Sequence, residues 1–158
     1  MKVLRKYGIL ALLLLVGSFS FSLSAKNEGA KASSKYPAGK VMEINKDEFV
    51  KRVFDFEHDQ EWKYKGDKPC ILDFYASWCG PCKKLSPHLD EVAAEYKDKI
   101  YIYKINVDVD RDLAAAFGAS SIPLVIFIPK EGTPAAARGY LPKEEVENAV
   151  ETVLHIKK

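Results

Sequence analysis

The sequence predicts a single α/β domain in which helices flank a mixed sheet of four or five strands. Apolar runs of strand length at 70–75, 100–107 and 124–128 are separated by segments in which apolar residues recur at helical spacing, at 82–96 and 146–154. The chain has 158 residues, of which 47% are apolar and 29% charged. This composition is ordinary for a globular protein, and the length leaves room for one hydrophobic core.

The first 25 residues have the plan of a secretory signal peptide. Three basic residues precede the apolar run 9–16, and serines alternate with apolar residues up to Ala25. We expect cleavage near Ser24 or Ala25, although Leu23 stands where a small residue is preferred. The run is too short to span a bilayer alone, but apolar residues beyond it could extend it to a signal anchor. We therefore expect export to the periplasm, with secretion or membrane anchoring as the alternatives.

Removal of this signal leaves a chain that is nearly neutral. It takes three of the 24 basic residues and none of the 22 acidic ones, which leaves 21 against 22. The segment 26–40 is rich in Lys, Ala, Ser and Gly, and we expect a flexible leader there before a globular domain at 41–158. Because no basic footprint remains, nucleic acid is not expected as a partner.

The globular part is expected to open with a short strand at 41–44 and a capped helix. Asn45 followed by Glu48 resembles a capping box, and Phe49 lies on the apolar side of the helix that would follow. The segment 57–68 then forms a polar loop that contains aromatic residues. We expect these aromatics to cover the core, with a binding surface as the alternative.

The run 70–75 is almost continuously apolar, which is typical of a central strand covered on both faces. Asp73 alone interrupts it. Burial of a lone carboxylate is costly unless the group is paired or protonated, so strand alternation could instead turn Asp73 to solvent. We expect Cys70 to be a small core residue rather than a third redox thiol.

Two cysteines follow this strand where the next helix begins. The positive end of a helix stabilises negative charge, and the thiolate is the nucleophilic form of cysteine, so Cys79 is well placed to attack a disulfide. Cys82 lies three positions on, close enough to attack a mixed disulfide at Cys79 and release the partner reduced. Gly80 permits a sharp bend, and Pro81 suits the first helical turn. The spacing predicts thiol–disulfide exchange, with Cys79 as nucleophile and Cys82 as resolving cysteine.

Two other interpretations of the cysteine pair are weaker. A structural disulfide that closes so short a ring would stabilise by roughly 2 kcal/mol, against about 3 for a 15-residue loop. Half of a zinc site needs two further ligands, and the remaining Cys and His residues form no second pair at ligand spacing. No metal is expected, and no phosphate-binding loop or flavin motif is visible, so no bound cofactor is expected either.

Beyond the active-site helix, the pattern predicts a strand at 100–107, a short helix at 110–117 closed by Gly118, a strand at 124–128 and an edge strand at 135–141. The final helix is indicated by an apolar stripe that runs from Val146 to Leu154.

The motif and its surroundings resemble the thioredoxin family over residues 41–154. Trp-Cys-Gly-Pro-Cys-Lys at 78–83 matches the reducing members letter for letter. Asp73 and Lys104 stand where that family has a buried aspartate and its partnering lysine, and Ile122–Pro123 matches its cis-proline segment. Leu124, where a threonine is usual, and the long segment 57–68 depart from the family pattern.

This resemblance implies the thioredoxin fold and a role for each matched residue. Asp73 would lie behind the disulfide with a raised pKa and exchange a proton with Cys82, and Lys104 would tune Asp73. The cis-proline segment would face the cysteine pair and bind an extended substrate segment. The substrate-binding residues implied are Trp78, Gly80, Pro81, Ile122 and Pro123.

The leading functional hypothesis is an exported reductase of protein disulfides. Its partners would be disulfide-containing client proteins and a membrane electron donor, because the chain holds no electron source of its own; a monomer is expected. Gly-Pro between the cysteines resembles the reducing subfamily rather than oxidases and isomerases, which commonly carry a histidine there. A net oxidase or isomerase remains an alternative, since the compartment is oxidising. A redox-inactive binding module is a third, against which the intact motif argues.

Overall fold

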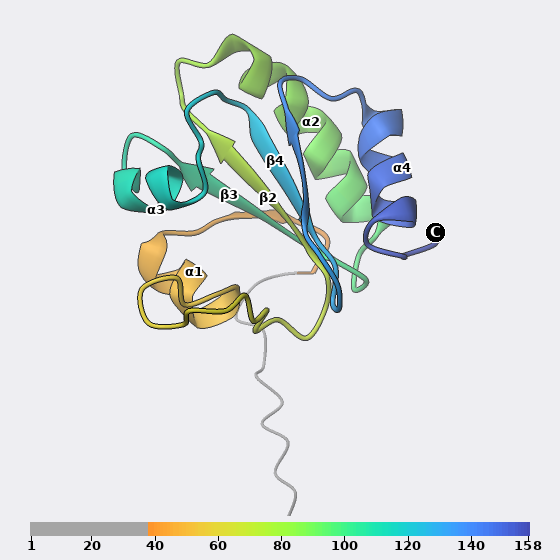
Figure 1. The fold of residues 1–158 in the computed structure, drawn as a ribbon. Coiled ribbons are helices and arrows are strands. Elements are labelled where there is room, and N and C mark those ends of the chain that lie inside the picture. The colour runs from red at the N-terminus through yellow and green to blue at the C-terminus, as the bar shows by residue number, and fades with distance from the viewer. Residues whose placement is uncertain (1–37) are drawn as a thin grey trace, which may run out of the picture. The chain divides into compact units, whose positions relative to one another are not determined.

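The computed structural model describes residues 38–158, and this part of the chain forms one α/β domain (Figure 1). The predicted signal at 1–25, and the predicted leader except for residues 38–40, lie outside the described residues. No helix within 38–158 is long and apolar enough to cross a membrane. The elements, in chain order, are β1 (Val41–Glu43), α1 (Lys46–Arg52), β2 (Cys70–Tyr75), α2 (Gly80–Glu95), β3 (Tyr101–Asn106), α3 (Arg111–Ala116), β4 (Leu124–Ile128), β5 (Ala135–Arg138) and α4 (Lys143–Thr152).

The strands form one mixed sheet in the order β1-β3-β2-β4-β5. The pairs β1–β3 and β2–β3 are parallel, whereas β4 runs antiparallel to both β2 and β5. Strand β2 is therefore central, with partners on both sides, as its almost continuous apolar sequence predicts. The five-stranded mixed sheet confirms the predicted fold class.

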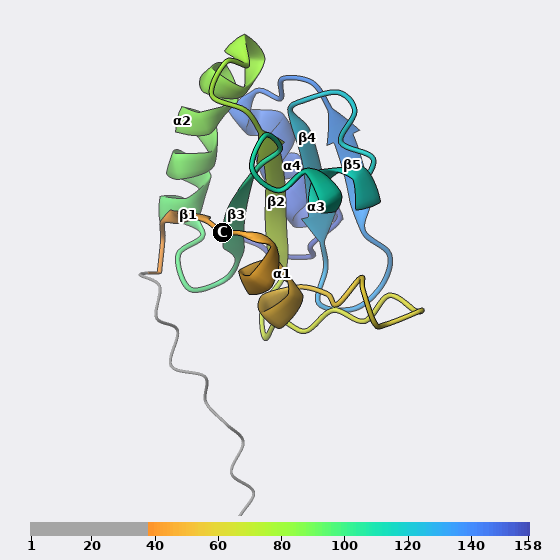
Figure 2. The ribbon, with the colours of Figure 1, turned by 90° about the vertical axis from the view of Figure 1, so that its left-hand side faces the viewer.

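Helices cover both faces of the sheet. Helices α2 and α4 lie on one face, and α1 and α3 on the other (Figure 1); Figure 2 looks onto the face that carries α1 and α3. Alternation along β2 sends Leu72 and Phe74 into the core beneath α1 and α3, and Ile71 into the core beneath α2 and α4. Each core is closed by buried helix side chains, such as Phe49 of α1 and Leu85 of α2.

The first helix begins where the sequence predicts. The side-chain oxygen of Asn45 accepts a hydrogen bond of 3.0 Å from the Glu48 N–H, which satisfies one of the unpaired donors of the first turn. Phe49 is fully buried, and its ring meets the Phe117 ring edge-on at a centroid distance of 5.1 Å. The cap thus fixes where α1 begins, and the aromatic contact packs α1 against Phe117 at the end of α3.

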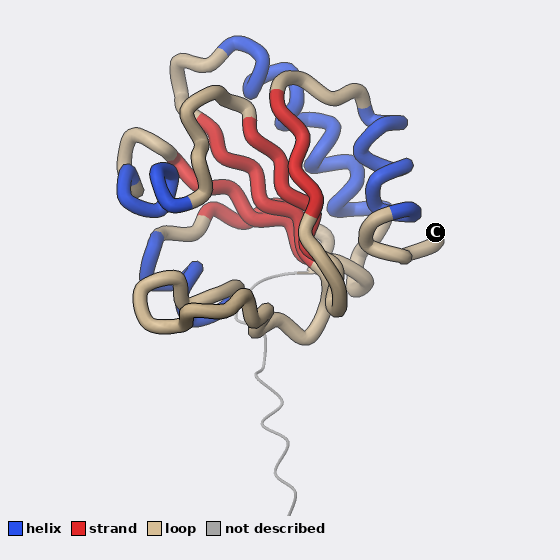
Figure 3. Tube along the Cα trace, viewed as in Figure 1, coloured by secondary structure: helices blue, strands red, loops and turns tan. Residues whose placement is uncertain are grey.

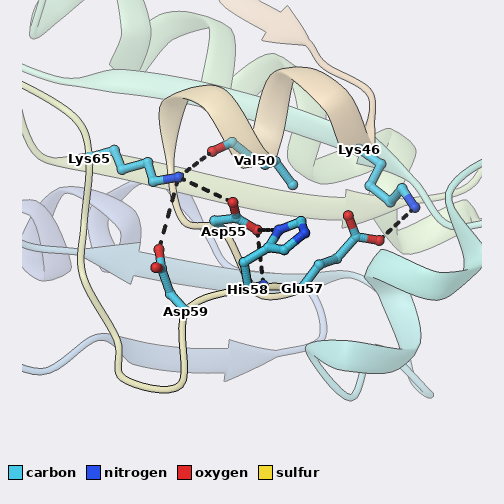
Figure 4. A network of polar contacts seen from close by, with 7 residues as sticks. All are labelled: Lys46, Val50, Asp55, Glu57, His58, Asp59 and Lys65. Carbon is cyan, nitrogen blue, oxygen red and sulfur yellow. Dashed lines mark hydrogen bonds and ion pairs between the residues drawn. The ribbon is translucent and has the colours of Figure 1, made fainter.

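The long loop after α1 is held by its own polar contacts (Figure 4). Asp55 accepts from the His58 N–H at 3.2 Å and lies 3.0 Å from the ring nitrogen Nδ1. Lys65 donates to the Val50 carbonyl at 3.0 Å, which ties the loop back to the helix. The Trp62 ring packs on Phe54 at a centroid distance of 4.8 Å. This packing agrees with the expectation that the loop aromatics cover the core.

The end of β5 is the predicted strand boundary that differs most from the structure. The edge strand β5 ends at Arg138 rather than at residue 141, because Gly139 adopts a φ of +89° that breaks the extended conformation. Helix α2 begins at Gly80, two residues before the apolar pattern at 82–96, with Cys79 as its N-cap residue. Pro81 falls in the first turn, where no N–H is needed, as the sequence predicts.

Candidate active site

The two cysteines lie at one end of the sheet, where β2 ends and α2 begins. The chain leaves β2 at Tyr75 and enters α2 at Gly80. Because β4 runs antiparallel to β2, the loop that precedes β4 meets the same end of the sheet, and Figure 3 shows both loops there. Cys79 and Cys82 form a disulfide with their Cα atoms 5.3 Å apart.

The backbone around Cys79 favours negative charge on its sulfur. Cys79 has extended geometry, and its Sγ accepts a hydrogen bond of 3.2 Å from the Cys82 N–H. That N–H is one of the first-turn donors that have no partner within the helix, and it points along the positive end of the helix dipole. No acidic residue occupies the first turn of α2 to oppose this effect. A thiolate at Cys79 would therefore be stabilised when the disulfide is reduced.

Asp73 is completely buried between the sheet and α2. Alternation along β2 puts it on the same face as Ile71, which packs against α2, so the alternative in which it turns to solvent is excluded. Neither carboxylate oxygen has a hydrogen-bond partner among the described residues. Burial raises the pKa of Asp73 to about 6, and the charge of Lys104 opposes part of this rise. A carboxyl group of this kind can take up and release a proton near neutral pH.

Lys104 is the register partner of Asp73 on the neighbouring strand β3. Its ammonium group donates to the Ser86 hydroxyl at 3.1 Å and lies 4.3 Å from the centre of the Tyr75 ring. Since Asp73 accepts no hydrogen bond, Lys104 acts on it through space rather than by direct contact.

The segment before β4 borders the disulfide. The Ile122–Pro123 peptide bond is cis, and Ile122 packs against the cluster formed by Ala76, Cys79 and Cys82. The carbonyl of Pro123 accepts a hydrogen bond of 2.8 Å from the Gly139 N–H, which joins this segment to the end of β5. The structure thus brings together the cysteine pair and the cis-proline segment, 40 residues apart in sequence numbering.

Exposed side chains complete the surface beside the disulfide. Trp78 is 67% exposed, and Gly80 and Pro81 are exposed as well. The Trp78 ring N–H donates to the Asp108 carboxylate at 2.9 Å, which holds the indole against the loop after β3. An apolar face next to a reactive disulfide can contact the side chains of a protein substrate.

Two residues of this site were not predicted from the sequence. Ser86 carried a usable signal, because it lies four residues after Cys82 and so shares its side of a helix. Asp108 carried none, because only the folded chain brings it to Trp78.

Cys70 stands apart from this site. It is completely buried in the core beneath α1 and α3, on the opposite face of the sheet from Asp73. Burial raises the pKa of its thiol to about 12, which leaves it protonated and unreactive. Within residues 38–158, no group of three or more His, Cys, Asp or Glu side chains is arranged to hold a metal ion.

Comparisons with known proteins agree with this site. The family model described as Thioredoxin matches residues 40–152. The thioredoxin of Borreliella burgdorferi is 40% identical over 110 residues, which cover 70% of this chain and 94% of that protein. The thioredoxin of Alicyclobacillus acidocaldarius is 43% identical over 91 residues, which cover 57% of this chain and 86% of that protein.

A solved structure agrees with the fold. The crystal structure of chloroplastic thioredoxin z matches with a TM-score of 0.60 and 27% identity, and the match covers 74% of this chain and 96% of that one. The resemblance and the fold predicted from the sequence are both confirmed. The chain belongs to the thioredoxin family and is a thiol–disulfide oxidoreductase.

Proposed function

We propose that the protein is an exported reductase of protein disulfides. The observation that carries this proposal is the Cys79–Cys82 disulfide at the N-terminus of α2, with the buried Asp73 beneath the same helix. Export is supported by the signal-like pattern of residues 1–25, and the periplasm is the compartment that we favour. We further propose that the protein works as a monomer.

The reaction consumes the reduced form of the cysteine pair. The Cys79 thiolate attacks one sulfur of the client disulfide; a mixed disulfide forms, and the other client sulfur leaves as a thiolate. Cys82 then loses its proton to Asp73 and attacks the Cys79 sulfur. The bond between Cys79 and the client breaks, the client leaves with both of its sulfurs reduced, and the Cys79–Cys82 disulfide remains. Two electrons have passed to the client.

The raised pKa of Asp73 suits it to the role of proton acceptor. An ordinary carboxyl group is too weak a base to help deprotonate a thiol, whereas a group with a pKa of about 6 exchanges protons readily near neutral pH. Lys104 keeps that value from rising further. Asp73 is therefore the base, and Lys104 tunes it.

The client is held beside the cysteine pair by exposed and backbone groups. Among the described residues, the Ile122 backbone takes part in no backbone hydrogen bond, so its N–H and carbonyl are available to an extended client segment. Pro123 fixes the direction of that backbone. Trp78, Gly80 and Pro81, which are exposed next to the two cysteines in sequence, offer apolar contact to the client.

The oxidised pair has to be reduced again before the next turnover. No bound electron source is expected from the sequence, so a partner must supply the electrons. Because an oxidising compartment offers none, we propose a membrane protein that brings electrons from the cytoplasmic side.

Trapping of the mixed disulfide tests the assignment of the two cysteines. The Cys82→Ala variant should accumulate a covalent complex with insulin, which carries disulfides, because attack by Cys79 still occurs but resolution does not. The Cys79→Ala variant is the matched control and should trap none. Non-reducing electrophoresis separates the complex from the free protein. Equal trapping by both variants would show that Cys79 is not the specific nucleophile.

A further inference from the structure

The Lys104 ammonium is held by two neutral groups rather than by an acid. It donates to the Ser86 hydroxyl of α2 at 3.1 Å and lies 4.3 Å from the centre of the Tyr75 ring, a favourable cation–π distance. Asp73, its register partner, accepts no hydrogen bond from it. The position of the ammonium is therefore set by Ser86 and Tyr75.

Lys104 has a carboxylate in register on each side. On β2 its partner is the buried Asp73, and on β1 its partner is Glu43, which is exposed to solvent. All three side chains point to the face of the sheet that α2 covers, because paired strand residues share a face. A charge acts more strongly on a group as it comes closer, and more strongly in the interior than in water. The placement of the ammonium between the two acids thus determines its effect on Asp73.

We propose that Ser86 is a positioning residue, whose hydroxyl holds the Lys104 ammonium beneath α2, where its charge acts on Asp73. Without the hydroxyl, the ammonium would be free to move toward water and the hydrated carboxylate of Glu43. This inference rests on the proposed role of Asp73 as the proton acceptor. The inference adds that Ser86, by holding Lys104 in place, helps to set the pH range in which Asp73 exchanges its proton.

Among the elements packed around Asp73, Lys104 is the residue whose charge lowers the pKa of Asp73. On β4 the register partner is Val125, which does not titrate. On β2, burial, with a smaller contribution from Glu43, raises the pKa of Tyr75 to about 12, so its phenol stays neutral. On α2, Cys82 is buried and does not titrate while it forms the disulfide with Cys79, and Lys83 and Lys84 are exposed to solvent. Lys104 supplies the charge that acts on the pKa of Asp73. The oxidised protein therefore isolates the effect of Lys104.

The test is a ¹³C NMR titration of the Asp73 carboxyl in the oxidised protein, with the signal assigned by its loss in Asp73→Asn. Lys104→Gln should raise the apparent pKa of Asp73 by about 1, the size expected for loss of a nearby opposite charge. Ser86→Ala should also raise the apparent pKa of Asp73, by about half as much. Ser86→Thr keeps the hydroxyl and should match the wild type. In the Lys104→Gln background, Ser86→Ala should change nothing.

Three results would overturn the proposal: a Ser86→Ala titration identical to the wild type, a fall in the apparent pKa, or the same rise in the Lys104→Gln background. Loss of the fold is not expected, because Ser86 is only partly buried and alanine favours a helix. The titration involves no turnover, so it is independent of whether Asp73 serves as the base. Failure of that role would appear separately, as an unchanged rate of insulin reduction in Asp73→Asn.

Discussion

Replacement of Asp73 by asparagine should stabilise the protein at neutral pH. The side chain is completely buried, and burial raises its pKa from 3.8 to about 6. A pKa difference of about 2 between the folded and unfolded states corresponds to about 3 kcal/mol, because each pKa unit is worth about 1.4 kcal/mol. Asparagine keeps the volume and carries no charge. Asp73→Asn should therefore gain up to about 3 kcal/mol in the free energy of unfolding at pH 7.

The gain should depend on pH in a defined window. Between about pH 4 and pH 6 the folded state binds a proton that the unfolded chain has released, so wild-type stability falls as the pH rises through this window. Below pH 4 the carboxyl is protonated in both states, and the advantage of Asp73→Asn should vanish. Above pH 6 the advantage should stay constant.

Urea unfolding of the oxidised protein from pH 3.5 to pH 8 measures this difference. Asp90→Asn, which removes an exposed carboxylate from the same helix α2, controls for the change in net charge. Equal or lower stability of Asp73→Asn at pH 7 would refute the reasoning. An advantage that persists unchanged at pH 3.5 would refute it as well, because the gain could not then come from ionisation.

Two further outcomes concern the rest of the domain. Trp62→Ala should lower the free energy of unfolding by about 1–2 kcal/mol, because the Trp62 ring, which is 37% exposed, no longer packs on Phe54. The rate of insulin reduction should not change. Slower insulin reduction at unchanged stability would instead indicate that the loop binds the client. In the oxidised protein at pH 8, iodoacetamide should leave Cys70 unmodified, as seen by mass spectrometry, until urea unfolds the chain. Rapid labelling of the native protein would contradict its burial.

Local features of the fold were predictable because neighbouring residues determine them. The Asn45 cap acts on a donor three residues away, and Gly118 closes α3 with a φ of +64°. The continuous apolar run of β2 is enough to predict a central strand, because such a run is typical of a sheet that is covered on both faces. The end of β5 was missed because the apolar pattern continues past Gly139, although the glycine itself marked a break.

The active site was predictable in part for a different reason. The cysteine spacing and the helix that follows indicate the chemistry directly, but the burial of Asp73 came only from the family resemblance, since alternation alone left its direction open. The contacts of Lys104 with Ser86 and of Trp78 with Asp108 join residues 18 and 30 positions apart. Such contacts depend on how helix, sheet and loops pack, which no local pattern records.

The midpoint potential of the Cys79–Cys82 couple decides the direction in which the protein works. Its Gly-Pro dipeptide places no cationic side chain beside Cys79, so the helix N-terminus is the main local aid to its thiolate, and the reduced form gains only modest stability. The midpoint potential of thioredoxins is about −270 mV, whereas that of strong disulfide oxidants is about −120 mV. Equilibration of the protein with glutathione buffers, followed by thiol alkylation, gives the value. A reductase requires a midpoint well below about −200 mV, and we expect one close to the thioredoxin value. A pair that stays reduced in buffers as oxidising as a secretory compartment, near about −180 mV, would show that the protein is an oxidase or isomerase.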